Sequence, residues 1–337
     1  MKIHWLKWAV AGFCLLLFIT IALNLDSVSE LDGAVYAAVS RLHSPAATEF
    51  FKACTLMVGP IVLLVISLTL VFILPRREYR IPILLNLSAA VLLNLGLKHV
   101  FSRPRPTEVV RIVVETGSSF PSGHTMAASC FYGFLIYLVW QLCRNRALRN
   151  AVTALLSLVI ALVGFSRVYL GVHYFTDVLA GLCVSVCYLI VFTSLVSRFF
   201  MHEENLKPKR LTPSNRNRLV FSFAYAFNGV LSGLRSERNM VIHFSAMATV
   251  VVFGALLRIS EMEWIACIIL FGVVLMAELI NTSIETIVDI VCPQEDPRAK
   301  LAKDTAAGAV LMVAIAAAVI GVMIFAPKIL DLVLTEV

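Results

Sequence analysis

Charged side chains are scarce in this sequence of 337 residues, at 15% against 60% hydrophobic residues. The apolar residues come in runs of about 17 to 25, which is long enough to cross a bilayer as helices. The scarcity excludes an ordinary soluble domain and predicts an all-α integral membrane protein. The predicted spans are residues 5–25, 56–74, 81–97, 123–142, 151–170, 176–197, 241–258, 263–290 and 306–326.

Three further absences narrow the class of protein. The eight cysteines are scattered and follow neither a disulfide framework nor zinc-ligand spacing, so we expect them to be packing residues. The sequence has no Walker-type glycine loop and no protein-kinase motif set, which excludes an ordinary soluble kinase site. Residues 1–25 end without a clear small-x-small cleavage site. We expect an uncleaved first span, with a cleavable signal peptide as the alternative.

Basic residues lie in alternate loops, and basic loops stay on the cytoplasmic side. The segment 26–49 is acidic, with Glu30 and Asp32, and is therefore predicted to lie outside. We expect a multi-pass protein of the bacterial inner membrane, with the N-terminus in the cytoplasm and the C-terminus outside. The loops account for the net charge of +7, so no nucleic-acid partner is needed. The basic residues include Lys2, Lys7, Arg76, Arg77, Arg80, Arg144, Arg146, Arg149, Arg198, Lys207, Lys209 and Arg210.

A polar stretch with two prolines, residues 199–217, separates two apolar blocks and indicates a cytoplasmic linker. It predicts a six-span domain over residues 1–198 and a second domain over residues 218–337. At the start of the second domain, residues 218–239 place apolar side chains near helical spacing. This pattern is typical of an amphipathic helix on the inner membrane surface, ahead of a three-span bundle. A buried helix of the soluble type is the alternative.

Polar residues of the first domain cluster in segments 97–106, 120–125 and 165–177, which the topology places together at the outer face. Fixed positive charge and neutral donors in this combination suit a phosphate, or a trigonal-bipyramidal group such as vanadate forms. The charges come from Lys98, Arg105 and Arg167, and the donors from Ser122 and the backbone of Gly123.

Two histidines in these segments, His124 and His173, are able to exchange protons near neutral pH. Asp177 follows His173 by four residues, one helical turn on, where its carboxylate can accept from the other imidazole nitrogen. A lone histidine or a basic residue at a span end is more often structural. The combination instead indicates a nucleophile, an orienting group, an acid and an anion clamp.

These residues form a three-part pattern: Lys98 with six residues before Arg105-Pro106, then residues 121–124 (PSGH), then Arg167 with five residues before His173 and three more before Asp177. The pattern resembles the signature of the type 2 phosphatidic-acid phosphatase family. The resemblance implies a metal-independent phosphatase with six spans. By it, His173 forms a phosphohistidine, Asp177 orients His173, and His124 protonates the leaving oxygen. The phosphoryl oxygens would be held by Lys98, Arg105, Ser122, Gly123 and Arg167.

In the second domain, the hydrophobic stretch 277–291 carries Glu278, Asn281, Glu285 and Asp289 on one helical face. A carboxylate inside a span costs about 2.5 to 3.5 kcal/mol, so three on one face suggest use. Carboxylates at a membrane surface suit Mg²⁺ that bridges phosphates, as in phosphoryl transfer from ATP to a lipid hydroxyl. Polar contacts between spans, or an ion path, are the alternatives from these residues alone.

Four segments of the second domain, residues 236–243, 259–264, 277–289 and 299–310, resemble the small prokaryotic diacylglycerol kinase family and most closely its undecaprenol kinase branch. The resemblance implies a homotrimer that uses ATP and Mg²⁺, with sites shared between subunits. By it, Glu278 is the catalytic base, and Glu237 and Glu285 bind the metal. The implied nucleotide contacts are Arg218, Tyr225, Asn281, Lys303 and Asp304.

The two predicted activities agree if the lipid is polyprenyl. Removal of one phosphate from undecaprenyl diphosphate outside, and phosphorylation of undecaprenol inside, would both yield undecaprenyl phosphate for cell-envelope synthesis. We therefore expect a bifunctional membrane lipid enzyme whose phosphatase half needs no cofactor. One alternative is a phosphatidate or phosphatidylglycerophosphate phosphatase fused to a diacylglycerol kinase. The other is an inactive lipid-binding scaffold.

Overall fold

The computed structural model describes residues 2–74, 77–107, 109–201, 218–236 and 238–335. Within these ranges every regular element is helical, which confirms the all-α prediction. The chain forms two compact units, one of Met1–Leu70 with Leu85–Ser197 and one of Val71–Leu84 with Arg198–Val337. The predicted linker lies almost wholly outside the described residues.

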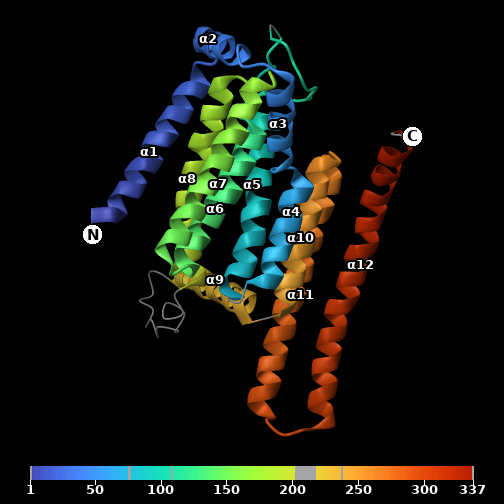
Figure 1. The fold of residues 1–337 in the computed structure, drawn as a ribbon. Coiled ribbons are helices and arrows are strands. Elements are labelled where there is room, and N and C mark those ends of the chain that lie inside the picture. The colour runs from blue at the N-terminus through green and yellow to red at the C-terminus, as the bar shows by residue number, and fades with distance from the viewer. Residues whose placement is uncertain (1, 75–76, 108, 202–217, 237, 336–337) are drawn as a thin grey trace. The chain divides into compact units, whose positions relative to one another are not determined.

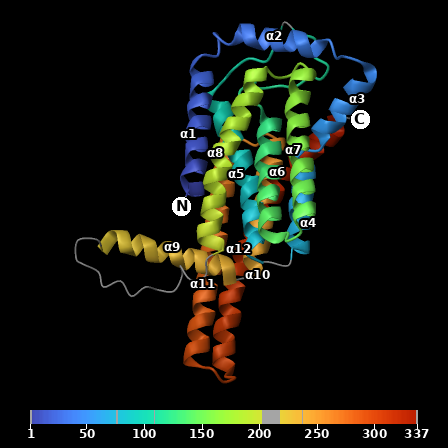
Figure 2. The ribbon, with the colours of Figure 1, turned by 60° about the vertical axis from the view of Figure 1, so that its left-hand side comes forward.

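The first unit is a bundle of nearly parallel helices with one helix lying across an end. Helices α1, α6, α7 and α8 stand beside one another, and α2 lies across them at the end where the connecting loops gather (Figures 1 and 2). Its helices, three of which run past the boundary of the unit, are α1 (Lys2–Leu23), α2 (Ser29–Ser40), α3 (Pro45–Leu56), α4 (Pro60–Ile73), α5 (Arg80–Val100), α6 (Gly123–Leu142), α7 (Arg146–Tyr169) and α8 (Phe175–Phe200).

Eight helices in the described part of the chain are long and apolar enough to cross a membrane. The predicted span 56–74 is different, because it falls on α3 and α4, which meet at a 49° bend and make a ninth span only if counted together. Large apolar side chains point outward from the bundle, as Phe13 and Leu16 do with exposed fractions of 67% and 65%. Such faces suit lipid contact.

Two apolar clusters flank the end of the bundle where α2 lies. In one, Val39 of α2 packs with Tyr169, Leu170 and Val178. In the other, Phe18 of α1 packs with residues of α8 and the loop before α6. Packing on both sides keeps water away from the polar groups between the clusters, which strengthens their electrostatic interactions.

The loop from Phe101 to Ser122 covers this end and meets the short turn between α7 and α8. In that turn Gly171 has a φ of +70°, a conformation that favours glycine. A Cβ atom at Gly171 would lie 2.4 Å from the carbonyl oxygen of Val110 in the covering loop. The close approach fixes the turn, and with it the next residues, against the loop.

Besides Val71–Leu84, the second unit contains four helices: α9 (Arg218–Ser236), α10 (Arg238–Leu256), α11 (Glu261–Val291) and α12 (Pro297–Thr335). Helices α11 and α12 form an antiparallel pair (Figure 1). A capping box formed by Ser260 and Glu263 starts α11. With 31 residues, α11 is about 46 Å long and exceeds a hydrocarbon core of about 30 Å.

Gly171→Ala should lower the stability of the first unit through two effects. An alanine must adopt a left-handed conformation, at about 1–2 kcal/mol, and must also push away the Val110 carbonyl, at about 1–3 kcal/mol. Gly117→Ala is the matched control, because Gly117 has a φ of +83° but open space around it. Thermal unfolding in detergent should show the larger drop for Gly171→Ala. Equal drops would show that the close approach is unimportant.

Candidate active sites

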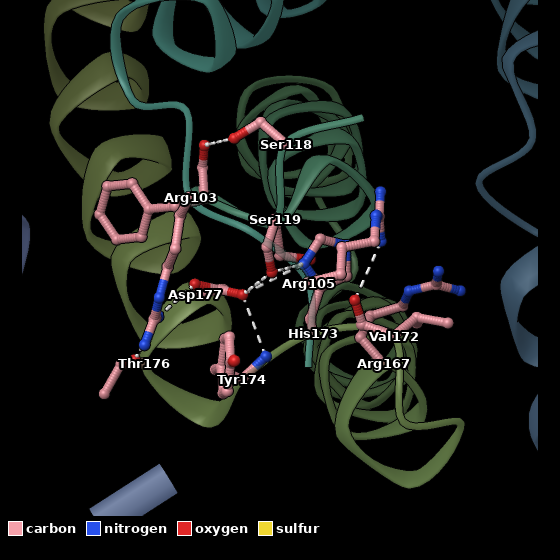
Figure 3. A network of polar contacts seen from close by, with 12 residues as sticks. Arg103, Arg105, Ser118, Ser119, Arg167, Val172, His173, Tyr174, Thr176 and Asp177 are labelled. Atoms are coloured by element: carbon pink, nitrogen blue, oxygen red, sulfur yellow. Dashed lines mark hydrogen bonds and ion pairs between the residues drawn. The ribbon is translucent and has the colours of Figure 1, made fainter. Parts of the chain in front are cut away.

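His173 and Asp177 lie at the start of α8 (Figure 3). His173 is 2% exposed, and its Nδ1 atom lies 3.4 Å from Asp177 Oδ2. The predicted contact therefore forms, but the prediction of one helical turn between them was wrong in detail, because His173 precedes the first residue of α8. With Nδ1–H directed at the carboxylate, the lone pair of the imidazole is on Nε2.

The carboxylate of Asp177 is held from several directions. Oδ2 accepts from the Tyr174 backbone N–H at 3.0 Å and from the Ser119 hydroxyl. Oδ1 accepts from Arg103 Nη1 at 2.6 Å. The bond to Tyr174 is that of a capping residue at the third position of a helix, which explains locally why Asp177 points back toward His173. These donors stabilise the negative charge and fix the direction of the imidazole.

Arg103 connects Asp177 to a second buried carboxylate. Its Nη2 atom donates to Asp32 Oδ2 at 3.0 Å, and its guanidinium stacks on the Tyr174 ring at 4.0 Å. Asp32, on α2, is 4% exposed and also accepts from the backbone and hydroxyl of Thr176. In the sequence, Asp32 indicated only that its segment lies outside the membrane. The structure makes it part of the network that positions Asp177.

Arg105 lies on the other side of the imidazole. Its Nη1 atom is 3.3 Å from His173 Nε2 and donates to the Val172 carbonyl at 2.9 Å. Further bonds to the carbonyls of Gly117 and Thr116 hold the guanidinium in one plane. The cation therefore faces the nitrogen that carries the lone pair, which is where a negatively charged group would meet the nucleophile.

Glu115, from the covering loop, brings the remaining predicted residues together. Its carboxylate contacts Arg167 and lies 2.9 Å from Arg105 Nη1, 3.9 Å from His173 Nε2 and 4.0 Å from His124 Nδ1. Burial raises the pKa of this carboxyl, but the neighbouring cations, Arg167 first, outweigh burial and lower it to about 2. Glu115 is therefore ionised at any working pH.

The N-terminus of α6 completes this site. Ser122 is buried and its N–H donates to the backbone carbonyl of Asp177, while Gly123 and His124 begin the helix. A helix N-terminus favours an anion. Lys98, near the end of α5, lines an adjoining cavity of about 430 Å³ and interacts electrostatically with the same cluster. All eight residues that the sequence assigned to the first domain thus lie in one region.

In the second unit, the acid face of α11, formed by Glu278, Asn281, Glu285 and Asp289, changes from buried to exposed along the helix. Glu278 is 1% exposed, and neither of its carboxylate oxygens has a hydrogen-bond partner among the described residues. His243 of α10 lies beside it, with Nε2 3.8 Å from Oε2. A buried carboxylate without a partner is costly, so the site is built to receive a group from outside the described residues.

Asn281 donates to Glu285 Oε1 at 2.9 Å, and its own Oδ1 atom has no partner within the described part of the unit. Farther along α11, Asp289 is paired with Lys303 of α12. Asp289, Lys303 and the exposed Asp304 line a cavity of about 650 Å³ at the tip of the α11–α12 pair. The residue predicted to meet the lipid, Glu278, and those predicted to meet the nucleotide therefore follow one another along the α11–α12 pair.

Three further predicted residues of this domain, Arg218, Tyr225 and Glu237, stand earlier in the sequence. Tyr225, on α9, is 47% exposed. Arg218 begins α9, but its side chain is outside the described atoms. Glu237 lies outside the described residues altogether.

The residues present fit a Mg²⁺ ion bridged by phosphates rather than one enclosed by protein. Among the side chains that the structure describes, no three histidine, cysteine or acidic groups converge as a metal site. Mg²⁺ is usually held by one or two carboxylates together with phosphate oxygens and water. Glu285, which is half-buried and next to the unpartnered Asn281 oxygen, is the described group best placed to hold it.

Comparison with known proteins decides the relationship of each unit. Residues 80–201 match the PAP2 superfamily, and residues 224–325 match the prokaryotic diacylglycerol kinase family. The chain is 41% identical to undecaprenol kinase of Bacillus subtilis (strain 168) over 112 residues, 33% of this chain and 91% of that protein. It is 32% identical to phosphatidylglycerophosphatase B of the same organism over 176 residues, 51% of this chain and 86% of that protein. The chain belongs to both families.

A crystal structure of a transmembrane PAP2-type phosphatidylglycerolphosphate phosphatase from Bacillus subtilis is also similar. It has 28% sequence identity and a TM-score of 0.50, and the match covers 57% of this chain and 96% of that one. The protein is thus a multi-pass membrane enzyme that joins a lipid phosphatase to a lipid kinase. This confirms the family resemblances seen in the sequence.

Sequence reasoning missed five residues that contact the predicted ones, directly or, for Asp32, through Arg103. Glu115 and Ser119 come from a loop without periodicity, which gives no signal for which side chain turns inward. Arg103 stands in the same run as Arg105 and could have been singled out there. The two others are Asp32 and His243.

Arg103→Met should cost about 3–5 kcal/mol of stability, because it leaves the buried carboxylate of Asp32 without its counter-charge. The double variant Arg103→Met, Asp32→Asn should recover part of this loss, since it removes the orphaned charge. Arg144→Met, in an exposed loop, is the control and should change little. Chemical unfolding of these proteins and of the single variant Asp32→Asn measures the coupling. If the stability losses of the two single changes simply added up in the double variant, the shared network would be contradicted.

The pH dependence of phosphatase kcat/KM should report the environment of His173. Burial lowers the pKa of this imidazole below its ordinary value of 6.5, although Asp177 acts in the opposite direction. Only the neutral ring can attack, so the rising limb of the rate should follow that lowered pKa. Asp177→Asn should move the midpoint farther down. A wild-type midpoint at or above pH 6.5 would contradict this assignment.

Proposed function

We propose that this enzyme makes a polyprenyl monophosphate by two routes. Its phosphatase half, residues 1–198, converts undecaprenyl diphosphate to undecaprenyl phosphate, and its kinase half, residues 218–337, phosphorylates undecaprenol. The observation that supports this most is the pairing, in one chain, of a cationic His173 site with an unpartnered acid face. The identity to undecaprenol kinase supports the choice of lipid.

In the proposed phosphatase reaction, His173 Nε2 attacks the terminal phosphorus. A P–N bond forms, the bond from phosphorus to the leaving oxygen breaks, and His124 donates a proton to that oxygen. Water then attacks the phosphohistidine, gives its proton to His124 and releases inorganic phosphate. Asp177 keeps the Nδ1–H of His173 oriented through both steps. Arg105 and Arg167 hold the phosphoryl oxygens together with Lys98, Ser122 and the Gly123 backbone.

In the proposed kinase reaction, Glu278 takes the proton of the lipid hydroxyl, whose oxygen attacks the γ-phosphorus of ATP and releases ADP. Glu278 is buried, and its carboxylate oxygens have no hydrogen-bond partner among the described residues, which leaves them able to accept that proton. When bound, Mg²⁺ neutralises charge on the phosphates. Glu285 and Glu237 would hold this ion. The nucleotide would contact Asn281, Lys303, Asp304, Arg218 and Tyr225.

The geometry of α11 supports a reaction between a membrane lipid and a soluble nucleotide. A hydrocarbon core of about 30 Å takes up about 20 residues of helix. If α11 enters the core near Glu261, the core ends near Glu278 and Asn281, and Glu285 lies beyond it. A lipid hydroxyl at the boundary then reaches Glu278 while ATP reaches Glu285. We place this end in the cytoplasm and the His173 site outside, in a bacterial inner membrane.

The kinase half is proposed to work as a homotrimer. The unpartnered oxygens of Glu278 and Asn281, together with exposed apolar side chains such as Ile280 and Ile287 on the same helix, support a neighbouring subunit. Glycerolipid turnover by the same two activities remains the second candidate function, and the name of phosphatidylglycerophosphatase B favours it for the phosphatase half.

Purified protein with labelled ATP and Mg²⁺ should phosphorylate undecaprenol faster than diacylglycerol. It should also release inorganic phosphate from undecaprenyl diphosphate. Faster phosphorylation of diacylglycerol would replace the polyprenyl proposal with glycerolipid turnover. If the parent protein phosphorylated no lipid, the inactive scaffold would be the one alternative left for the second unit.

Two variants separate the halves in the same assay. His173→Ala should lower the phosphatase rate by about three orders of magnitude and leave phosphorylation unchanged, because it removes the nucleophile. Glu285→Ala should have the opposite effect. The matched controls are His99→Ala and Glu261→Ala, which remove exposed side chains from α5 and α11.

A further inference from the structure

The Glu115 carboxylate lies among the side chains that the proposed function assigns to the phosphoryl group. One oxygen, Oε1, contacts Arg167 and lies 4.0 Å from His124 Nδ1. The other, Oε2, lies 2.9 Å from Arg105 Nη1 and 3.9 Å from His173 Nε2. The two oxygens therefore stand in for two oxygens of a bound phosphoryl group. Phosphorus cannot reach His173 until the carboxylate has left.

Arg167 requires an anion at this position. Its side chain is 1% exposed, its Nη2 atom contacts Glu115, and its Nε atom has no hydrogen-bond partner in the described part of the chain. A buried cation that loses its counter-charge is strongly destabilised. The position is therefore filled either by Glu115 or by a substrate phosphate, and each excludes the other.

Arg105 keeps its orientation whichever anion is present. Its hydrogen bonds to the carbonyls of Val172, Thr116 and Gly117 do not involve the Glu115 side chain. The turn that carries Glu115 has open space beside Gly117, where a Cβ atom would meet nothing within 4 Å. When Glu115 leaves, a formed phosphate site remains.

We propose that Glu115 is a specificity-determining residue of the phosphatase, which admits only headgroups whose phosphate carries more negative charge than the carboxylate it displaces. This inference rests on the proposed function and adds the substrate class. A phosphodiester has a single negative charge, as Glu115 has, so the exchange gains no Coulomb energy. A terminal phosphomonoester carries about −1.5 to −2 near neutral pH. The site therefore takes lipids with a terminal phosphate and stays free of phosphodiester phospholipids.

The test compares wild type, Glu115→Gln and the control Glu30→Gln, which removes an exposed acid from α2. In mixed micelles we would measure inhibition of the phosphatase by inorganic phosphate and by phosphatidylglycerol, a phosphodiester lipid. Glu115→Gln should bind inorganic phosphate at least tenfold more tightly and become sensitive to phosphatidylglycerol. The control should match wild type. If Glu115→Gln unfolds, Glu115→Asp, whose shorter side chain reaches the two arginines less well, should give a smaller shift in the same direction.

Binding of inorganic phosphate, measured by thermal stabilisation without turnover, distinguishes two kinds of failure. If wild type and Glu115→Gln bind phosphate equally while kcat falls, Glu115 positions His124 and the inference is overturned. If wild type neither binds phosphate nor hydrolyses any lipid phosphate, the proposed function of the site fails, and the inference fails with it.

Discussion

Buried charge at one end of a helical bundle is the constraint on which the phosphatase unit depends. Asp32, Arg103 and Asp177 alternate in sign and are each nearly inaccessible to water. In such a place every charge must have a partner, because an uncompensated ion costs several kcal/mol. The network therefore holds α2, the covering loop and α8 in one arrangement, and the direction of the His173 imidazole follows from it.

The same constraint explains what could be predicted from the sequence. Hydropathy predicts most spans because a hydrocarbon solvent leaves helices as the only option for an isolated segment. The spacing of His173 and Asp177 predicts their contact because both lie at one helix start. Glu115 and Ser119 enter from a loop that follows no period, and Asp32 comes from a helix distant in sequence. No local pattern could indicate that these three side chains turn toward the site.

The kinase unit differs, since the carboxylate oxygens of Glu278 and the amide oxygen of Asn281 have no hydrogen-bond partner among the described residues. Periodicity predicted the acid face of α11, and exposure falls along this face from Asp289 to Glu278. Periodicity could not show what covers that face. In our proposal, the groups that complete the site around Glu278 come from the substrates, from Glu237 and from a second subunit.

Joining the two activities in one chain is useful only if the phosphatase spares the product of the kinase. A phosphatase that removed every terminal phosphate would reverse phosphorylation of the lipid, and the two halves would consume ATP to no effect. Competition between Glu115 and the substrate for Arg105 and Arg167 offers a physical means of avoiding this. A diphosphate brings more charge into the site than a monophosphate and displaces the carboxylate more readily. In our proposal the diphosphate is therefore the better substrate, and the monophosphate that it yields is hydrolysed more slowly.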